Sequence, residues 1–406
     1  MDNQKQNANN AELIEALKLD DDEQITRKPS GSSDLKGKMR KILMLIIVFI
    51  VLLIVVVWLL SLVSGKKQSY KDIESTMKKA AEKYYSNHKG ELPAEDKATS
   101  EVSLQKLING KYMKDISSYK SGSGSCSGKV VVENNDDEYL YISYLDCGEK
   151  YTTTELFREI TKEENVVTED SGLYYMNGEY VFRGEDVNNF VKIDENIWRI
   201  VKVDKNNEVV LILDEPYVNV KNWDNRYNTA RKMSYGYNDY KKSRLREYNE
   251  AIYEASKNND TSEYKKLLLS EKMVKYLSGY NLCYGNRAAT DSTNDNSIEC
   301  KNVLENAKVG ALTLSDFINA STDPECKTAT SKSCQNYNYL ITNKKTFWLI
   351  TGNTVNSYEV YRVNQYGKLE SIQASSYSSI RPVIHLNSKT MFNSGTGEEV
   401  NPYTIK

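Results

Sequence analysis

The sequence is poor in the residues and motifs that usually mark an enzyme. Only two histidines, His88 and His385, occur among its 406 residues. It has no P-loop, G-x-G-x-x-G turn, H-E-x-x-H helix or G-x-S-x-G elbow. His385 stands alone on a predicted strand, where a histidine usually pairs with a neighbouring polar group. Zinc sites need Cys/His clusters that this sequence lacks. We therefore expect no catalytic residue, no cofactor and no metal site.

Charge of either sign is not in excess. The chain has 54 Lys and Arg against 56 Asp and Glu, a formal net charge of -2. A nucleic-acid-binding surface is usually strongly basic, so we expect no nucleic-acid partner. Carboxylates are plentiful, but nothing in the sequence singles out the facing pair that a glycosidase needs. A carbohydrate-active enzyme of the cell envelope is therefore kept as an alternative.

Cysteine is absent from the first 125 residues, and six cysteines follow. They form three local pairs: Cys126 with Cys147, Cys283 with Cys300, and Cys326 with Cys334. Such pairs are typical of disulfides formed in an oxidising compartment. We expect three disulfides and an extracellular position for everything after the N-terminal region.

One long apolar run extends from Ile42 to Val63, interrupted only by Ser61. As a helix it would be roughly 33 Å long, enough to cross a hydrocarbon core of about 30 Å. It is too long and too far from the N-terminus for a cleaved signal, and it lacks the processing motif of a pilin helix. The run predicts a single transmembrane helix over residues 41–64 in contact with lipid, after a largely disordered cytoplasmic tail over 1–40. The chain is then a single-pass protein of the cell membrane.

Residues 65–155 predict a small module of helices and an antiparallel hairpin. An amphipathic helix after residue 69 is followed by Glu91-Leu92-Pro93, then by a second helix ending in Gly110-Lys111-Tyr112-Met113. The segment GKVVVENNDDEYLYISYLD alternates on both sides of a turn and predicts the hairpin. This order resembles the head region of Gram-positive pilin-like proteins. The resemblance implies a pilin-like fold and keeps open a structural role in a pilus-like or secretion assembly.

A polar linker is expected over residues 156–172, and residues 173–406 then predict a larger mixed α+β domain. Strand-like segments open and close this region, with helical and loop-rich sequence between them. We expect its first and last strands to pair. Arg381 is expected to hydrogen-bond loop carbonyls rather than take part in catalysis.

Several motifs of the larger region recur in a known order. They are Ile197-Trp198-Arg199-Ile200-Val201, Val309-Gly310-Ala311-Leu312-Thr313-Leu314-Ser315-Asp316-Phe317, Phe347-Trp348-Leu349-Ile350-Thr351 and Ile380-Arg381-Pro382-Val383-Ile384-His385-Leu386. This set resembles an uncharacterised surface domain of Firmicutes and Mollicutes (DUF6273-like). More distantly, it resembles the C-type-lectin-like fold of formylglycine-generating-enzyme relatives. The resemblance implies a surface-exposed domain and leaves the activity undefined.

Together these features favour a membrane-anchored extracellular surface protein that binds or adheres without enzymatic activity. Its ligand would be a glycan, another envelope component or a protein. Tyrosine is frequent, with 30 residues against seven phenylalanines, and suits wet binding surfaces. The aromatic residues that we predict to contact a ligand are Tyr217, Trp223, Tyr227, Tyr235 and Tyr237.

Overall fold

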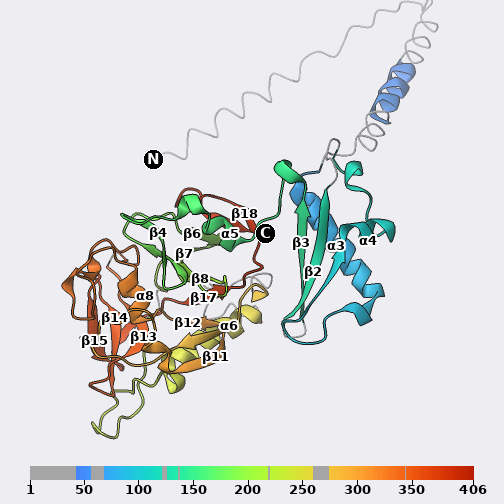
Figure 1. Cartoon of the computed structure of the whole chain (residues 1–406). Helices are drawn as coiled ribbons and strands as arrows, with labels where there is room; N and C mark the ends of the chain where they lie inside the picture. The colour runs from blue at the N-terminus through green and yellow to red at the C-terminus, as the bar shows by residue number, and fades with distance from the viewer. Residues whose placement is uncertain are drawn as a thin grey trace, which may run out of the picture. The chain divides into compact units, whose positions relative to one another are not determined.

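The structure is a computed structural model, and it describes residues 43–55, 68–120, 126–135, 138–217, 220–258, 274–342 and 344–406. The chain divides into two compact units, Met1–Lys67 and Gln68–Lys406. Figure 1 shows the whole chain, with the described elements coloured by residue number. Several sheets and helices alternate in the second unit, so the predicted mixed α+β content is confirmed.

The prediction of a transmembrane helix over residues 41–64 is wrong. In the first unit residues 43–55 form a helix with exposed apolar side chains. None of the helices in the described ranges is both long and apolar enough to span a bilayer. The rest of the expected span, 41–42 and 56–64, and the tail over 1–40 lie outside the described residues.

The second unit begins with helix α3 (Tyr70–Asn87), which packs on a three-stranded antiparallel sheet (Figure 1). Ser69 and Asp72 form a capping box that starts the helix. The apolar face of α3, with Ile73 and Met77 fully buried, makes the core of this module of helices and three strands, which is the smaller part of the second unit. The remaining elements are β1 (Thr99–Ser103), α4 (Leu104–Asn109), β2 (Ser127–Asn135) and β3 (Glu138–Asp146).

The ends of the β2–β3 hairpin are joined by a disulfide between Cys126 and Cys147. Cys283–Cys300 and Cys326–Cys334 are the other two bridges, and the described residues contain no free cysteine. The prediction of three sequence-local disulfides is confirmed. Each bridge closes a short loop, which removes conformational freedom mainly from the unfolded chain.

The larger part is built on a nine-stranded sheet with the path β12-β17-β8-β7-β6-β19-β18, joined by the β4–β5 hairpin through β7. Its last strand, β19, runs parallel to β6 and not beside β4, so the first and last strands do not pair as expected. The strands are β4 (Gly172–Met176), β5 (Glu179–Arg183), β6 (Phe190–Ile193), β7 (Asn196–Val203), β8 (Val209–Leu213), β12 (Val309–Gly310), β17 (Val383–Leu386), β18 (Phe392–Ser394) and β19 (Tyr403–Ile405).

A second sheet has five strands in the order β15-β14-β13-β16-β9. They are β9 (Val220–Asn222), β13 (Phe347–Gly352), β14 (Glu359–Val363), β15 (Leu369–Gln373) and β16 (Tyr377–Ser379). The chain passes from β8 of the first sheet to β9 of the second, and later returns from β16 of the second sheet to β17 of the first. Strands β8 and β17 are antiparallel neighbours, as are β9 and β16. Two short connections therefore carry the chain from one sheet to the other at the same place.

Arg381 lies in one of these connections and is 1% exposed. Its guanidinium donates to the carbonyls of Leu213 (2.8 Å), Leu340 (2.5 Å) and Asp214 (2.7 Å). The expectation that Arg381 hydrogen-bonds loop carbonyls is confirmed. Burial lowers the pKa of Arg381 to about 10, so the guanidinium stays charged at neutral pH. Pro382 follows in the connection and has no N–H to leave unpaired.

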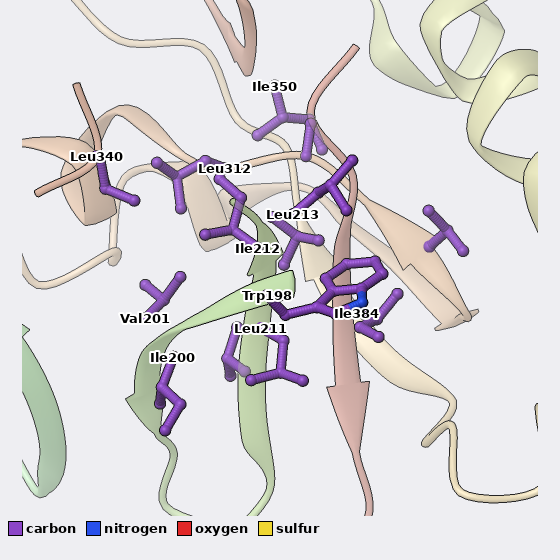
Figure 2. Close-up of a cluster of buried hydrophobic side chains, with 14 of the residues drawn as sticks. Trp198, Ile200, Val201, Leu211, Ile212, Leu213, Leu312, Leu340, Ile350 and Ile384 are labelled. Atoms are coloured by element: carbon purple, nitrogen blue, oxygen red, sulfur yellow. The ribbon is translucent and has the colours of Figure 1, made fainter. Parts of the chain in front are cut away.

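The core between the sheets is made of aliphatic side chains around Trp198 (Figure 2). All five residues of β8 are buried, as are all four of β17. Strands buried on both faces read as continuous apolar runs rather than alternating ones. Leu312, Leu340 and Ile350 reach this core from outside the first sheet (Figure 2).

Helices and a small ribbon complete the larger part. The helices are α5 (Leu156–Ile160), α6 (Arg244–Lys257) and α8 (Leu314–Asn319), and β10 (Tyr280–Cys283) pairs with β11 (Val303–Ala307). Leu156 and Ile160 of α5 are buried in the larger core, so the region expected as a polar linker contributes to packing. Thr313 caps α8 by accepting the Asp316 N–H.

Replacing Arg381 with lysine tests the role of its three hydrogen bonds. A lysine ammonium cannot present the same planar fork, so at least one buried carbonyl loses its donor. We expect Arg381→Lys to lower the free energy of unfolding by about 2–4 kcal/mol, measured by denaturant unfolding of the larger part. Arg158→Lys is the matched control, because Arg158 lies at the surface beside Glu155 and such pairs contribute about 0–1 kcal/mol. Equal effects of the two variants would contradict this role for Arg381.

Thiol labelling tests the cysteine pairing. Protein purified without reductant and then denatured should label at no cysteine, and after reduction it should label at six, since every cysteine is bridged. The single variant Cys283→Ser should release one thiol, which mass spectrometry should locate at Cys300. Labelling at any other cysteine in that variant would show that the pairing is different.

Candidate functional site

A cavity of about 260 Å³ lies against one face of the nine-stranded sheet. Its floor includes Val181, Lys202, Val210 and His385. These residues form one row across four strands, because Val181 pairs with Lys202, Lys202 with Val210, and Val210 with His385. Residues opposite one another in neighbouring strands point to the same face of a sheet. Strand register therefore brings this lysine and this histidine to one cavity.

The walls of the cavity come from β10, from the loop closed by the Cys283–Cys300 disulfide, and from α8. A buried ion pair holds this loop. Nη1 of Arg287 lies 3.1 Å from Oε1 of Glu299, and both side chains are inaccessible to solvent. Ser315 of α8 donates its hydroxyl to Glu299 and accepts from Arg287. The pair thus connects the disulfide loop to α8 and fixes the wall.

Lys202 carries the charge at the centre of the floor. Its ammonium lies 3.1 Å from Oε2 of Glu179 and 3.3 Å from Oδ1 of Asp316, and its side chain is 13% exposed. Asn296 and Thr313 also donate to the Asp316 carboxylate. One cation, two anions and neutral donors give a site rich in hydrogen-bonding groups.

Lys202, Glu179 and Asp316 form a charged triad, and their contacts explain the pKa shifts of Lys202 and Asp316. Burial alone would lower the pKa of Lys202, but Asp316 and Glu179 outweigh it and raise that pKa above its usual value. Burial likewise opposes ionisation of Asp316, yet Lys202, Asn296 and Thr313 hold the pKa of its carboxyl below the ordinary value. Lys202 and Asp316 therefore stay ionised at neutral pH, which does not suit Asp316 to act as a general acid there.

A second polar cluster lies where β7 turns into β8. Asp204 and Glu208 occupy the two ends of this turn, and Oδ1 of Asp204 accepts the backbone N–H groups of Asn206 and Glu208, each at 2.9 Å. Asn207 supplies the left-handed conformation that the turn needs, with φ of 61°. Nδ1 of His385 lies 3.1 Å from Oε2 of Glu208 and 3.9 Å from Oδ2 of Asp204. His385 thus pairs with a neighbouring polar group, as expected.

Tyr280 covers the imidazole of His385. The two rings are stacked, with centroids 3.6 Å apart and planes 6° from parallel. The Tyr280 hydroxyl is buried and has no hydrogen-bond partner within the described parts of the chain. A buried hydroxyl left unpaired costs about 1–3 kcal/mol, so a polar group beside it would be stabilised.

The predicted aromatic residues do not form one exposed cluster. Trp223 is fully buried and donates its indole N–H to the Leu349 carbonyl at 2.9 Å, so it belongs to the core and cannot line a binding surface. Tyr217 is half-buried and packs against the same core. Tyr227 is 58% exposed. Tyr235 lies against Tyr358, and Tyr237 hydrogen-bonds Thr229. Ligand binding by these tyrosines stays a prediction.

The residues that line the cavity could not be identified from local sequence patterns. Alternation from Trp198 and Ile200 would place Lys202 on their face of β7, but a bulge between Ile200 and Lys202 turns it to the face of Val210 and His385, so the pattern does not identify it. Tyr280 and Asp316 of the cavity, and Glu208 beside His385, come from separate segments that only the tertiary fold brings together. Comparison with models of known families, with curated proteins and with solved structures finds no match. The resemblances to pilin-like and DUF6273-like modules therefore stay predictions.

Replacing Lys202 with methionine tests the triad. Removing the ammonium leaves two poorly exposed carboxylates without their cation, and we expect a loss of about 3 kcal/mol of stability at pH 7. In the intact protein the lowered pKa of Asp316 contributes stability above the unfolded-state carboxyl pKa, near 4, and this is lost as the pH falls. The deficit of Lys202→Met should therefore shrink below about pH 4.

Lys192→Met is the matched control for this experiment, because Lys192 is exposed on β6 of the same sheet. It should change the free energy of unfolding by less than about 0.5 kcal/mol at either pH. A Lys202→Met deficit that is as large at pH 3 as at pH 7 would show that packing, and not charge, explains the effect.

Proposed function

We propose that the chain is a non-enzymatic binding protein of an extracytoplasmic, oxidising compartment and that the cavity receives its ligand. The three disulfides support this compartment, because such bridges persist where thiols are oxidised. The cavity carries the argument for binding, since it combines ionised, amide and hydroxyl groups on a rigid floor and wall. Rigid walls reduce the entropy lost when a ligand is bound.

The lining suits a ligand with many hydroxyl groups, such as a glycan. Lys202 and Asp316 offer a donor and an acceptor, and Asn281, Asn294 and Asn319 add amides that can do both. The cavity volume, about 260 Å³, is below the 300–1,000 Å³ of pockets that enclose a drug-sized ligand. We therefore propose that it holds one residue or one end of a longer saccharide.

Binding is favoured over hydrolysis by the state of the carboxylates. A glycosidase needs one carboxyl that is protonated near neutral pH and a second that is ionised. Here Glu179 and Asp316 share the ammonium of Lys202, and the pKa of Asp316 is lowered. Asp316 is therefore not in an environment that would keep a proton for a leaving group.

A glycan array probed with the full chain tests this proposal. Asn281→Trp should weaken every positive glycan at least about tenfold, because Asn281 is exposed at the cavity and an indole there would fill it. Asn302→Trp is the matched control, an exposed asparagine in the same region that does not line the cavity. It should leave binding unchanged.

Three results would contradict the proposal. No binding to any glycan would exclude this ligand class. Binding lost in Tyr227→Ala or Tyr235→Ala but kept in Asn281→Trp would place the ligand on the predicted tyrosines instead. Release of reducing sugar that is abolished by Asp316→Asn would favour the enzyme alternative.

A further inference from the structure

We propose that Asp204, Glu208 and His385 bind one divalent transition-metal ion with the ligand preference of Zn²⁺ or Mn²⁺. Within the part of the chain that the structure describes, this is the one group of three or more such residues whose ligand atoms gather closely enough, all within 4.8 Å of one another. The proposal goes beyond ligand binding in the cavity and does not depend on it.

The distances between ligand atoms suit a shared ion. Two ligands that are each about 2.1 Å from one ion lie about 3.0 Å apart at a right angle and about 3.4 Å apart at a tetrahedral angle. Nδ1 of His385 is 3.1 Å from Oε2 of Glu208 and 3.9 Å from Oδ2 of Asp204. An ion would need only a small inward movement of Asp204, together with transfer of the imidazole proton to Nε2.

Charge balance gives a second reason. As metal ligands, two carboxylates and a neutral imidazole would together carry two negative charges, and their side chains are only 11–15% exposed. Lys202, which is poorly exposed on the floor of the cavity, is already paired with Glu179 and Asp316. A divalent ion would offset both carboxylate charges.

The surrounding groups hold the three ligands in place, as outer-shell partners do in metal sites. Ser278 donates its hydroxyl to the other oxygen of Glu208. Two backbone N–H groups fix Oδ1 of Asp204 and leave Oδ2 toward the histidine. Tyr280 stacks on the imidazole and limits rotation of the ring. The ligand set is therefore oriented before an ion arrives.

The composition of the set selects the kind of ion. Calcium prefers six to eight oxygen ligands, and magnesium prefers oxygen ligands and retains its waters. One imidazole with two carboxylates suits zinc, manganese and related ions. Three protein ligands leave at least one coordination position open, and Asp204 and His385 both line the cavity from which water or a ligand could fill it.

Calorimetric titration of the full chain tests the site. Protein treated with chelator and dialysed should bind one Zn²⁺, and Ca²⁺ should not compete. Asp204→Asn, Glu208→Gln and His385→Gln should each weaken binding about 10–100-fold. His88→Gln is the matched control, because His88 is the only other histidine and stacks on Tyr84 in the smaller part. It should bind Zn²⁺ as the unchanged chain does.

A spectroscopic measurement keeps the test decisive if a ligand variant fails to fold. In the His88→Gln chain His385 is the sole histidine, so its imidazole proton resonances are assigned without further work. Zn²⁺ should shift or broaden them at one equivalent. Failure to bind one equivalent, undiminished binding in folded His385→Gln, or unchanged His385 resonances would each overturn the proposal. None of these readouts involves a glycan, so they separate this site from the proposed function.

Discussion

The buried guanidinium of Arg381 fixes the place where the chain crosses between the two sheets of the larger part. Its three carbonyl partners lie at the end of β8, in the connection that follows, and in the distant segment around Leu340. A buried charge of this kind tolerates few alternative arrangements, because any other position leaves it or the carbonyls unpaired. Once Arg381 is in place, β17 must start beside the end of β8, and their register is set.

That register decides what the sheet presents to the cavity. The row from Val181 through Lys202 and Val210 to His385 depends on the register of β5, β7, β8 and β17, including the bulge between Ile200 and Lys202 in β7. A shift of one residue in β17 would turn His385 to the opposite face. The wall is fixed separately by the Arg287–Glu299 pair and the Cys283–Cys300 bridge. The arrangement of polar groups in the cavity thus depends on buried charged side chains, Arg381 and the Arg287–Glu299 pair, that would not contact a ligand.

Local signals explain which features could be predicted from the sequence. The disulfides join cysteines only 8 to 21 residues apart, and the cap of α3 lies within four residues. The Arg-Pro step suggested a structural arginine, and alternation in β2 and β3 predicted their hairpin. The cavity depends on pairs such as Glu208 with His385, which are 177 residues apart, and no local pattern encodes them. The parallel placement of β19 and the burial of Trp223 in a loop were hidden for the same reason.

The position of β19 has a consequence for how the protein is made. This strand lies between β6 and β18, yet it leaves the ribosome about 210 residues after β6. At about 5–20 residues per second, β6 waits roughly 10–40 s for its neighbour during synthesis. In that interval one edge of a hydrophobic sheet is open to pairing with other nascent chains. The strands of the smaller part are all synthesised by Asp146 and can pair at once, whereas the nine-stranded sheet of the larger part is complete only when its final strand emerges.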